Sequence, residues 1–137
     1  MSIISGGGSG HKPAFGGLVG VGLLTTSVAG MVFASPAPKQ VLAAIEGADS
    51  SKGVLVTVMN YTEDFLNFGV AVERPKQEIP KCRLRYLSLV TALVFHEAGP
   101  RKVGRRGIAG TVFVHKIAVQ WLQRGLDLMR QRGLVFL

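Results

Sequence analysis

Residues 53–59 read Gly-Val-Leu-Val-Thr-Val-Met, an uninterrupted uncharged run in which four residues are β-branched. Such side chains pack well on a pleated surface, and a run without polar alternation is typical of a strand that is buried on both faces. Strands of this kind occur in parallel sheets, whose crossover connections place helices on the faces. The run therefore predicts that residues 54–58 form an inner strand of an α/β domain.

The sequence before this run supplies a second strand and a covering helix. The Ile-Ile-Ser sequence at residues 3–5 predicts a short strand that enters a tight glycine loop over residues 6–11, because glycine tolerates positive φ angles. Residues 41–45 have helical spacing and follow Pro36 and Pro38, which suit the start of a helix. Strand, loop and helix thus alternate as they do in α/β folds.

The sequence after the run continues this alternation and then becomes less regular. Phe65, Phe68 and Val72 recur at i, i+3 and i+7 and predict a second helix. Residues 82–95 permit a strand but show neither clean alternation nor turn residues. A last helix is predicted from the apolar face formed by Ile108, Val112, His115, Val119 and Leu122. We interpret the histidine on this face as a structural residue.

Two loops of the predicted fold occupy the place where α/β proteins bind ligands, beyond the carboxyl ends of strands. The loop over residues 6–11 ends in His11, a side chain suited to proton transfer near neutral pH, although a flexible glycine linker is the alternative. It is not a Walker A loop, and His11 stands where a G-x-G-x-x-G motif needs glycine. The second loop ends in Glu63 and Asp64, which as helix N-terminal acids would also be favoured by the helix dipole.

The net charge of +8 is distributed unevenly along the chain. Residues 1–71 carry 3 basic and 4 acidic side chains, a net charge of −1, whereas residues 72–137 carry 13 and 4, a net charge of +9. A non-enzymatic polyanion binder is therefore one alternative function. No zinc-finger spacing and no RNA-recognition aromatic motif accompanies the charge, so we expect no specific nucleic-acid partner.

A small single-pass membrane protein is the other alternative. Residues 13–38 form an uncharged stretch of 26 residues between Lys12 and Lys39, longer than the ~20 residues a transmembrane helix needs. The stretch is rich in Gly, Ser and Thr, which weakens insertion, and we expect no membrane partner. The single Cys82 and a start without a secretory signal instead suit a reducing compartment, so a cytoplasmic location is expected.

Several motifs in register resemble the dihydroxyacetone (glycerone) kinase family. They are Ile-Ser-Gly-Gly-Gly-Ser-Gly-His at residues 4–11, Phe-Ala-Ser-Pro at 33–36, Asn-Tyr-Thr-x-Asp at 60–64, Asn-Phe at 67–68, Gly-Arg-Arg-Gly-Ile-Ala-Gly-Thr-Val at 104–112 and His-Lys at 115–116. The similarity covers residues 3–74 and 103–119. Residues 1–137 are accordingly identified as part of a substrate-binding domain of this family.

The resemblance implies an incomplete parallel-sheet α/β domain with flanking helices that binds dihydroxyacetone. The family phosphorylates this ketone, and a separate helical domain or subunit supplies ATP and Mg²⁺, so no cofactor or metal is expected on this chain. The resemblance also implies that Gly8, Ser9, Gly10, His11 and Asp64 line the ketone site. His11 and Asp64 would orient and deprotonate the attacking hydroxyl, a role that suits an imidazole and a carboxylate during phosphoryl transfer.

The chain departs from the family pattern at several positions that the family uses for substrate binding and catalysis. Lys12 stands where the family has glutamate, and Met59 stands where it has a substrate-contacting lysine. The family's covalent substrate histidine and its opening strands have no counterpart in these 137 residues, so we expect no catalysis by the chain alone and self-association through unpaired sheet edges. Residues 83–100 and 120–137 lack the family pattern, and we hypothesise that both are out-of-frame translations.

Overall fold

The fold is a parallel four-stranded sheet with helices on both faces. A computed structural model describes residues 1–10, 14–48, 50, 52–59, 61–78, 84–89 and 110–124. In chain order the elements are β1 (Ser2–Ser9), the 3-10 helix η1 (Gly16–Leu18), β2 (Thr26–Val32), α1 (Pro38–Gly47), β3 (Val54–Met59), α2 (Thr62–Glu78), β4 (Leu84–Leu89) and α3 (Thr111–Gln123). The strands lie in the order β2-β1-β3-β4, and every pair is parallel. The predicted α/β class is confirmed, and β3 is the inner strand expected at residues 54–58.

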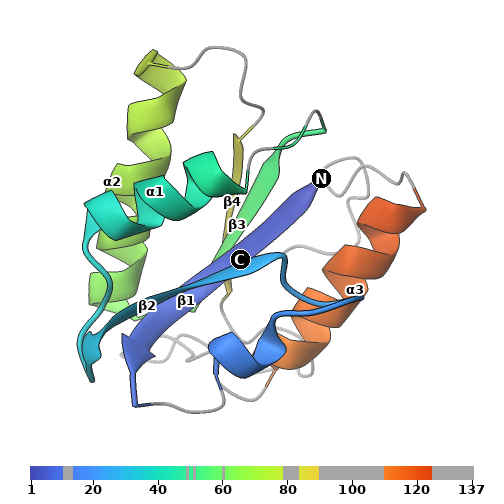
Figure 1. Cartoon of the computed structure of the whole chain (residues 1–137), viewed down its shortest axis with the longest axis horizontal. Helices are drawn as coiled ribbons and strands as arrows, with labels where there is room; N and C mark the ends of the chain where they lie inside the picture. Colours follow the sequence, from blue (N-terminus) through green and yellow to red (C-terminus); the bar gives the residue numbers. More distant parts are fainter. Residues whose placement is uncertain are drawn as a thin grey trace, which may run out of the picture.

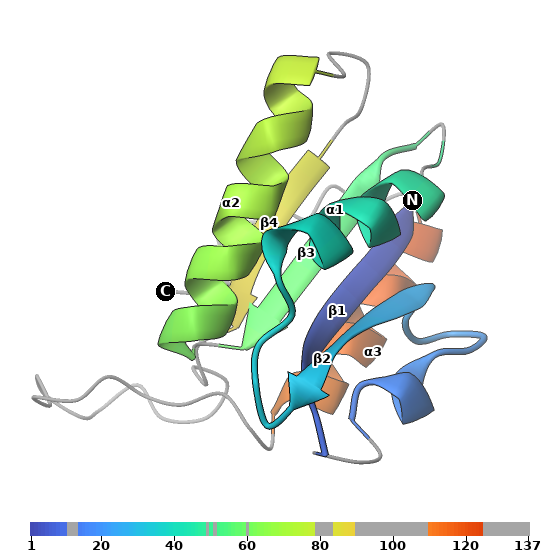
Figure 2. The same cartoon turned by 60° about the vertical axis from the view of Figure 1, so that its left-hand side comes forward.

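Helices cover the sheet as two separate layers (Figures 1 and 2). The α1 and α2 helices lie on one face, whereas α3 and η1 lie on the other. The predicted helix at residues 41–45 is confirmed within α1, where Val41 and Ile45 are buried. Its start is also explained, because Pro38 opens the helix and the Gln40 side chain accepts a hydrogen bond from the Ala37 amide at 2.8 Å.

Each layer has its own apolar core. On the face of α1 and α2 the buried residues are Ile4, Val28, Val41, Ile45, Ala48, Val54, Val56, Val58, Phe68, Ala71 and Val72. On the face of α3 they are Ile3, Phe15, Leu24, Leu55, Ala118 and Val119. Successive residues of β1 and β3 thus alternate between the two cores, as side chains on a strand must. This explains why β3 has no polar face.

The first strand is longer than the sequence indicated. The prediction of a glycine loop beginning at residue 6 was wrong, because β1 runs through three glycines to Ser9 and pairs with β2 along this stretch. The physical reason is close packing: a Cβ on Gly6 would lie 2.9 Å from the Val28 Cβ and 3.1 Å from the Phe68 ring. Among the residues of this run that the structure describes, a positive φ, the property expected of the whole loop, occurs only at Gly10, with φ 99°.

The stretch considered as a membrane span has a different conformation. Its described residues form η1 and then β2, which is hydrogen-bonded to β1 as part of the sheet. Among the helices that the structure describes, none is long and apolar enough to cross a bilayer. The membrane alternative therefore has no support in the fold.

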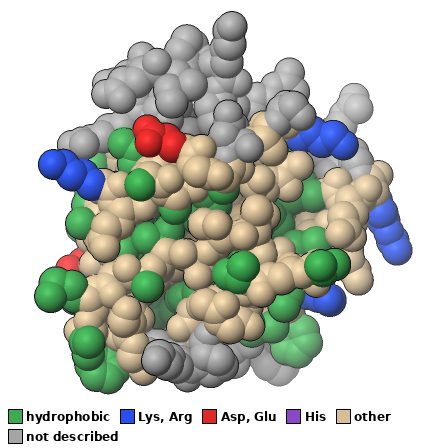
Figure 3. Space-filling view, viewed as in Figure 1, with side chains coloured by type: hydrophobic (Ala, Val, Ile, Leu, Met, Phe, Trp, Pro, Cys, Tyr) green, Lys and Arg blue, Asp and Glu red, His purple; other side chains and the backbone are tan. Residues whose placement is uncertain are grey.

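The basic half of the chain is described only in part. Most of its Lys and Arg residues lie outside the described residues, so the polyanion alternative stays a prediction. On the face seen in Figure 3, the described Lys and Arg side chains lie at the periphery and form no continuous patch. Parts of the two segments proposed as out-of-frame are described. Within residues 83–100, β4 pairs with β3 over its full length, and within residues 120–137, α3 extends to Gln123. The remainder of these segments lies outside the described residues, and their origin stays a hypothesis.

Candidate functional site

A cavity of about 510 Å³ opens at the carboxyl ends of β1 and β3. The chain leaves β1 toward the face of η1 and α3, whereas it leaves β3 into α2 on the opposite face (Figure 1). Two neighbouring strands whose connections diverge in this way leave a crevice between them, which is where α/β folds bind ligands. The cavity is lined by Gly7, Gly8, Ala14, Phe15, Leu18, Phe33, Ala34, Ser35, Met59, Tyr61, Thr62, Glu63, Asp64, Thr111 and Val112.

The end of β1 forms a wall that only glycine allows. A Cβ on Gly7 would lie 3.0 Å from Phe15 Cε2 and 3.7 Å from Asp64 Oδ2, so the bare backbone sits directly beside the carboxylate. A Cβ on Gly8 would lie 2.9 Å from the Ala34 nitrogen. The glycines therefore let β1 approach both the site and the turn that follows β2.

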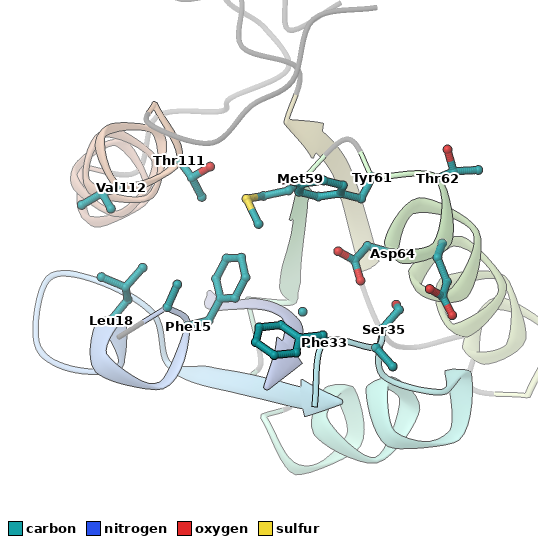
Figure 4. Close-up of a pocket in the computed structure, with 15 residues that line it drawn as sticks. Phe15, Leu18, Phe33, Ser35, Met59, Tyr61, Thr62, Asp64, Thr111 and Val112 are labelled. Atoms are coloured by element: carbon teal, nitrogen blue, oxygen red, sulfur yellow. The ribbon is translucent and has the colours of Figure 1, made fainter. Parts of the chain in front are cut away.

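Asp64 is the buried charged residue of the site. It lies in the first turn of α2, where the helix dipole favours a negative charge, and is 7% exposed. Its carboxylate points into the cavity in Figure 4. The N-terminus of α2 abuts the cavity. A carboxylate at this position is therefore favoured by the helix dipole and also faces the cavity, so both interpretations of Asp64 fit its placement. Glu63 also lines the cavity but is exposed to solvent.

Aromatic rings form much of the remaining wall. Phe15 is buried beneath the site, whereas Phe33 lies at its rim with 72% of its surface exposed. Phe33 adopts a φ of 53°, a left-handed conformation that is costly for a bulky residue and is often found near functional sites. This turn places the Phe33 ring against Gly10, where a Cβ would lie 3.0 Å from it. Ser35 adds a buried hydroxyl for which the described residues offer no hydrogen-bond partner.

The residues predicted for the ketone site have different placements. Gly8 and Asp64 both line the cavity, although they are far apart in sequence. The Ser9 hydroxyl donates a hydrogen bond to the Gly30 carbonyl of β2, and Gly10 packs under Phe33; neither lines the cavity. His11 lies outside the described residues, so its meeting with Asp64 stays a prediction.

Sequence reasoning missed most of the apolar wall. Phe15, Leu18 and Phe33 come from the uncharged stretch before residue 38, and α3 contributes Thr111 and Val112. The Phe-Ala-Ser-Pro and Gly-Thr-Val motifs did mark Phe33, Ser35 and the start of α3, but they gave no indication of which side chains face a ligand. Met59, where the family resemblance expects lysine, does line the cavity.

The lining chemistry suits a small neutral polar molecule. The described lining residues combine two carboxylates with hydroxyl and aromatic side chains and include no Lys or Arg, so an anion would meet repulsion. Carboxylate oxygens accept hydrogen bonds from hydroxyl groups, and aromatic walls exclude water around them. Among the described residues, no group of three or more His, Cys, Asp or Glu could hold a metal ion.

Comparison with known proteins gives this geometry a family context. The model of the Dak1 domain matches residues 1–133. The chain is 45% identical to dihydroxyacetone kinase 2 of Saccharomyces cerevisiae over 131 residues, which cover 93% of this chain and 21% of that protein. It is 44% identical over 117 residues, 85% of this chain and 34% of the relative, to the dihydroxyacetone-binding subunit of the PTS-dependent dihydroxyacetone kinase of Lactococcus lactis.

A solved structure shows the same fold. The native dihydroxyacetone kinase of C. freundii superimposes with a TM-score of 0.79 at 42% identity, covering 94% of this chain and 23% of that one. The chain thus spans about a fifth of the length of the S. cerevisiae and C. freundii dihydroxyacetone kinases and about a third of the L. lactis subunit.

Proposed function

The chain belongs to the Dak1 domain family, and from this membership we propose that its cavity binds dihydroxyacetone as the substrate of an ATP-dependent kinase. The observation that carries the proposal is the buried Asp64 carboxylate facing the bare backbone of Gly7 at the sheet's crevice. Relatives at similar identity are named dihydroxyacetone kinases or a dihydroxyacetone-binding subunit. Binding of the ketone is the role common to these names.

The lining residues suggest how the ketone is held. Asp64 would accept a hydrogen bond from one hydroxyl of the ligand, and the Ser35 hydroxyl is placed to satisfy another polar atom. Phe15 and Phe33 would pack against the three-carbon chain and exclude water. A three-carbon ketone fills only part of a cavity of about 510 Å³, which leaves room for the phosphoryl group of a donor, provided that Mg²⁺ bound to the donor offsets its negative charge.

In the phosphoryl transfer we propose, the ligand hydroxyl attacks the γ-phosphorus of ATP and loses its proton to Asp64, with His11 as a second acceptor. As the new phosphorus–oxygen bond forms, the bond between the γ-phosphorus and the β–γ bridging oxygen breaks, so ADP leaves and dihydroxyacetone phosphate is the product. ATP and Mg²⁺ would be supplied by a separate domain or subunit, so the chain's own contribution is to bind and orient the ketone and to accept the proton of its hydroxyl. We expect no ATP-dependent phosphorylation of dihydroxyacetone by the purified chain alone.

Titration of the full chain with dihydroxyacetone, followed by calorimetry, tests the binding proposal. Asp64→Asn removes the buried charge and keeps the shape of the side chain, so we expect roughly tenfold weaker binding. Glu46→Gln is the control, because it makes the same kind of change at an exposed carboxylate of α1 that does not line the cavity, and it should alter affinity less than about twofold. Equal affinities for the wild type and Asp64→Asn, or no saturable heat with the wild type, would reject the proposal.

A coupled assay with ATP, Mg²⁺ and dihydroxyacetone tests the expected inactivity of the isolated chain. A preparation of the Asp64→Asn variant controls for contaminating kinase from the expression host. Turnover by the wild type above this control would show that the chain catalyses by itself.

We also propose that the protein acts in the cytoplasm, since one cysteine in 137 residues suits a reducing compartment. Subcellular fractionation of a tagged chain tests this location. Recovery in a secreted or membrane fraction would contradict it.

A further inference from the structure

A buried polar group lies on the α3 face of the sheet, directly behind the cavity. The Thr57 hydroxyl on β3 is 3.0 Å from His115 Nε2 on α3 and 3.1 Å from the Ile4 carbonyl on β1. Thr57 and His115 are both 0% exposed. These contacts connect α3 to the two central strands in a region that is otherwise apolar.

The positions of these atoms determine where the proton of the imidazole lies. The Thr57 hydroxyl has one proton, and the Ile4 carbonyl can only accept it. The hydroxyl oxygen must therefore act as the acceptor toward His115, so Nε2 carries the hydrogen. Nδ1 is then a bare acceptor, and it is buried without a hydrogen-bond partner among the described residues. Burial lowers the pKa of His115 to about 4, which keeps this single-proton form at neutral pH.

His115 does not line the cavity but contacts its walls. Thr111 and Val112, which do line it, lie one helical turn before His115 on α3. The Phe15 ring, another wall, lies between the cavity and His115, with its centroid 6.3 Å from that of the imidazole and a tilt of 57°. A shift of the imidazole would therefore move two parts of the cavity wall.

We infer that His115 is a positioning residue of the ketone pocket: its Nε2–H ties α3 to β3 through Thr57, and its ring supports Phe15 from behind. This inference rests on the proposed binding of dihydroxyacetone in that pocket. It assigns a ligand-related role to a residue that the sequence and its burial mark only as part of the core.

If the role of His115 were merely structural, affinity for the ligand would fall only together with the stability of the fold. If His115 positions the pocket, affinity falls even where stability is kept. Replacement by methionine removes the hydrogen bond to Thr57, which lowers stability, but it also removes the unpartnered Nδ1 from the core, which raises it. The midpoint of unfolding should therefore change little in His115→Met. Affinity should nonetheless fall, because the walls carried by α3 and Phe15 lose their fixed position.

The experiment compares three variants of the full chain by calorimetry with dihydroxyacetone and by urea unfolding. We expect His115→Met to bind roughly five- to tenfold more weakly. His115→Gln, whose amide can donate to Thr57 although it lacks the ring behind Phe15, should recover part of this loss and bind at least twofold more tightly than His115→Met. Thr57→Val leaves the imidazole in place but removes its acceptor, so it should show the same loss of affinity as His115→Met. If His115→Met does not fold, Thr57→Val provides the test of the inference. Wild-type affinity in the methionine and valine variants would overturn the inference.

A ligand-free measurement separates this inference from the proposed function. Nitrogen-15 spectra of the imidazole should show a neutral ring protonated at Nε2 between pH 6 and 8, and the backbone amides of α3 should exchange with solvent faster in His115→Met than in His115→Gln. A ring protonated at Nδ1, or equal exchange in both variants, would reject the positioning role. Absence of binding by the wild type together with the expected spectra would reject the proposed ligand and leave the link between His115 and the cavity wall intact.

Discussion

At the scale of single residues, His115 makes stability depend on pH. Desolvation by burial lowers its pKa from 6.5 to about 4, so the folded chain takes up this proton less readily than the unfolded chain. The contribution to stability is fully present above about pH 6.5 and is lost as the pH falls from 6.5 toward 4. A shift of this size corresponds to about 3 kcal/mol.

We therefore expect the free energy of unfolding to fall by about 2–3 kcal/mol more between pH 7 and pH 4.5 in the wild type than in His115→Gln. The glutamine variant does not titrate in this range, so it also corrects for the carboxylates that do. Urea unfolding followed by circular dichroism at the two pH values measures the difference. Parallel pH dependences in both proteins would show that His115 is not desolvated as the structure indicates.

Ser5 is a second residue whose burial has a measurable consequence. It is 0% exposed on β1, and its hydroxyl has no hydrogen-bond partner among the described residues. Leaving such a group unsatisfied in the core is unfavourable, so Ser5→Ala should be neutral or stabilise the fold by up to about 1 kcal/mol. Thr57→Val is the contrast, since it deletes a buried hydroxyl that is paired, and should destabilise. A clear loss of stability in Ser5→Ala would mean that its hydroxyl has a partner.

At the scale of elements, the pairing of β1 with β2 depends on glycine. A Cβ at Gly6 would meet backbone and side-chain atoms of Val28 on β2 and the Phe68 ring on α2, neither of which can move without disturbing the core. We expect Gly6→Ala to destabilise the chain by about 3 kcal/mol, at the upper end of the usual cost of overpacking. Thermal unfolding of the variant measures this loss.

The matched control lies within α2. A Cβ at Gly69 would meet no atom within 4 Å outside its own helix backbone. Alanine is favoured over glycine inside a helix by about 0.5–1 kcal/mol, so Gly69→Ala should stabilise the chain. The two substitutions add the same methyl group and should have opposite signs, and a similar effect at both positions would contradict the packing described for β1.

At the scale of the whole molecule, the edge of the sheet bears on association. In the described sheet β2 is hydrogen-bonded on one side only, to β1. Met31 and Val32 at its end are 80% and 73% exposed, next to the exposed Phe33. An edge strand with exposed apolar side chains is a template for pairing with another chain. We therefore propose that the chain self-associates through β2.

Sedimentation velocity over a concentration series tests this association. Met31→Lys places a charge on the edge and should shift the chain toward monomer, whereas Val21→Lys adds the same charge at a fully exposed loop residue and should not. A wild type that remains monomeric at all concentrations, or an equal response to both substitutions, would exclude association through this strand.

Local sequence alone determined several elements of this fold and the character of one buried residue. The valine-rich run of β3, the helical spacing in α1 and α2 and the apolar face around His115 were all predictable, because burial on one or both faces leaves a periodic trace within a few residues. Gly8 and Asp64 were expected at the ligand site through the resemblance of their motifs to a family, and both line the cavity, although Gly8 lies within β1 and not in a loop after it.

Tertiary structure decided where β1 ends and which residues meet at the cavity. Whether Gly6 belongs to a loop or to a strand depends on how closely β2 and Phe68 approach it. The residues next to Gly6 in the sequence do not determine these contacts. The approach of Asp64 to Gly7, and of Phe15 and Thr111 to the same cavity, depends on the strand order and on the face that each connection crosses. These are contacts between distant segments, fixed by packing the sheet against two helical layers, and periodicity along the chain cannot specify them.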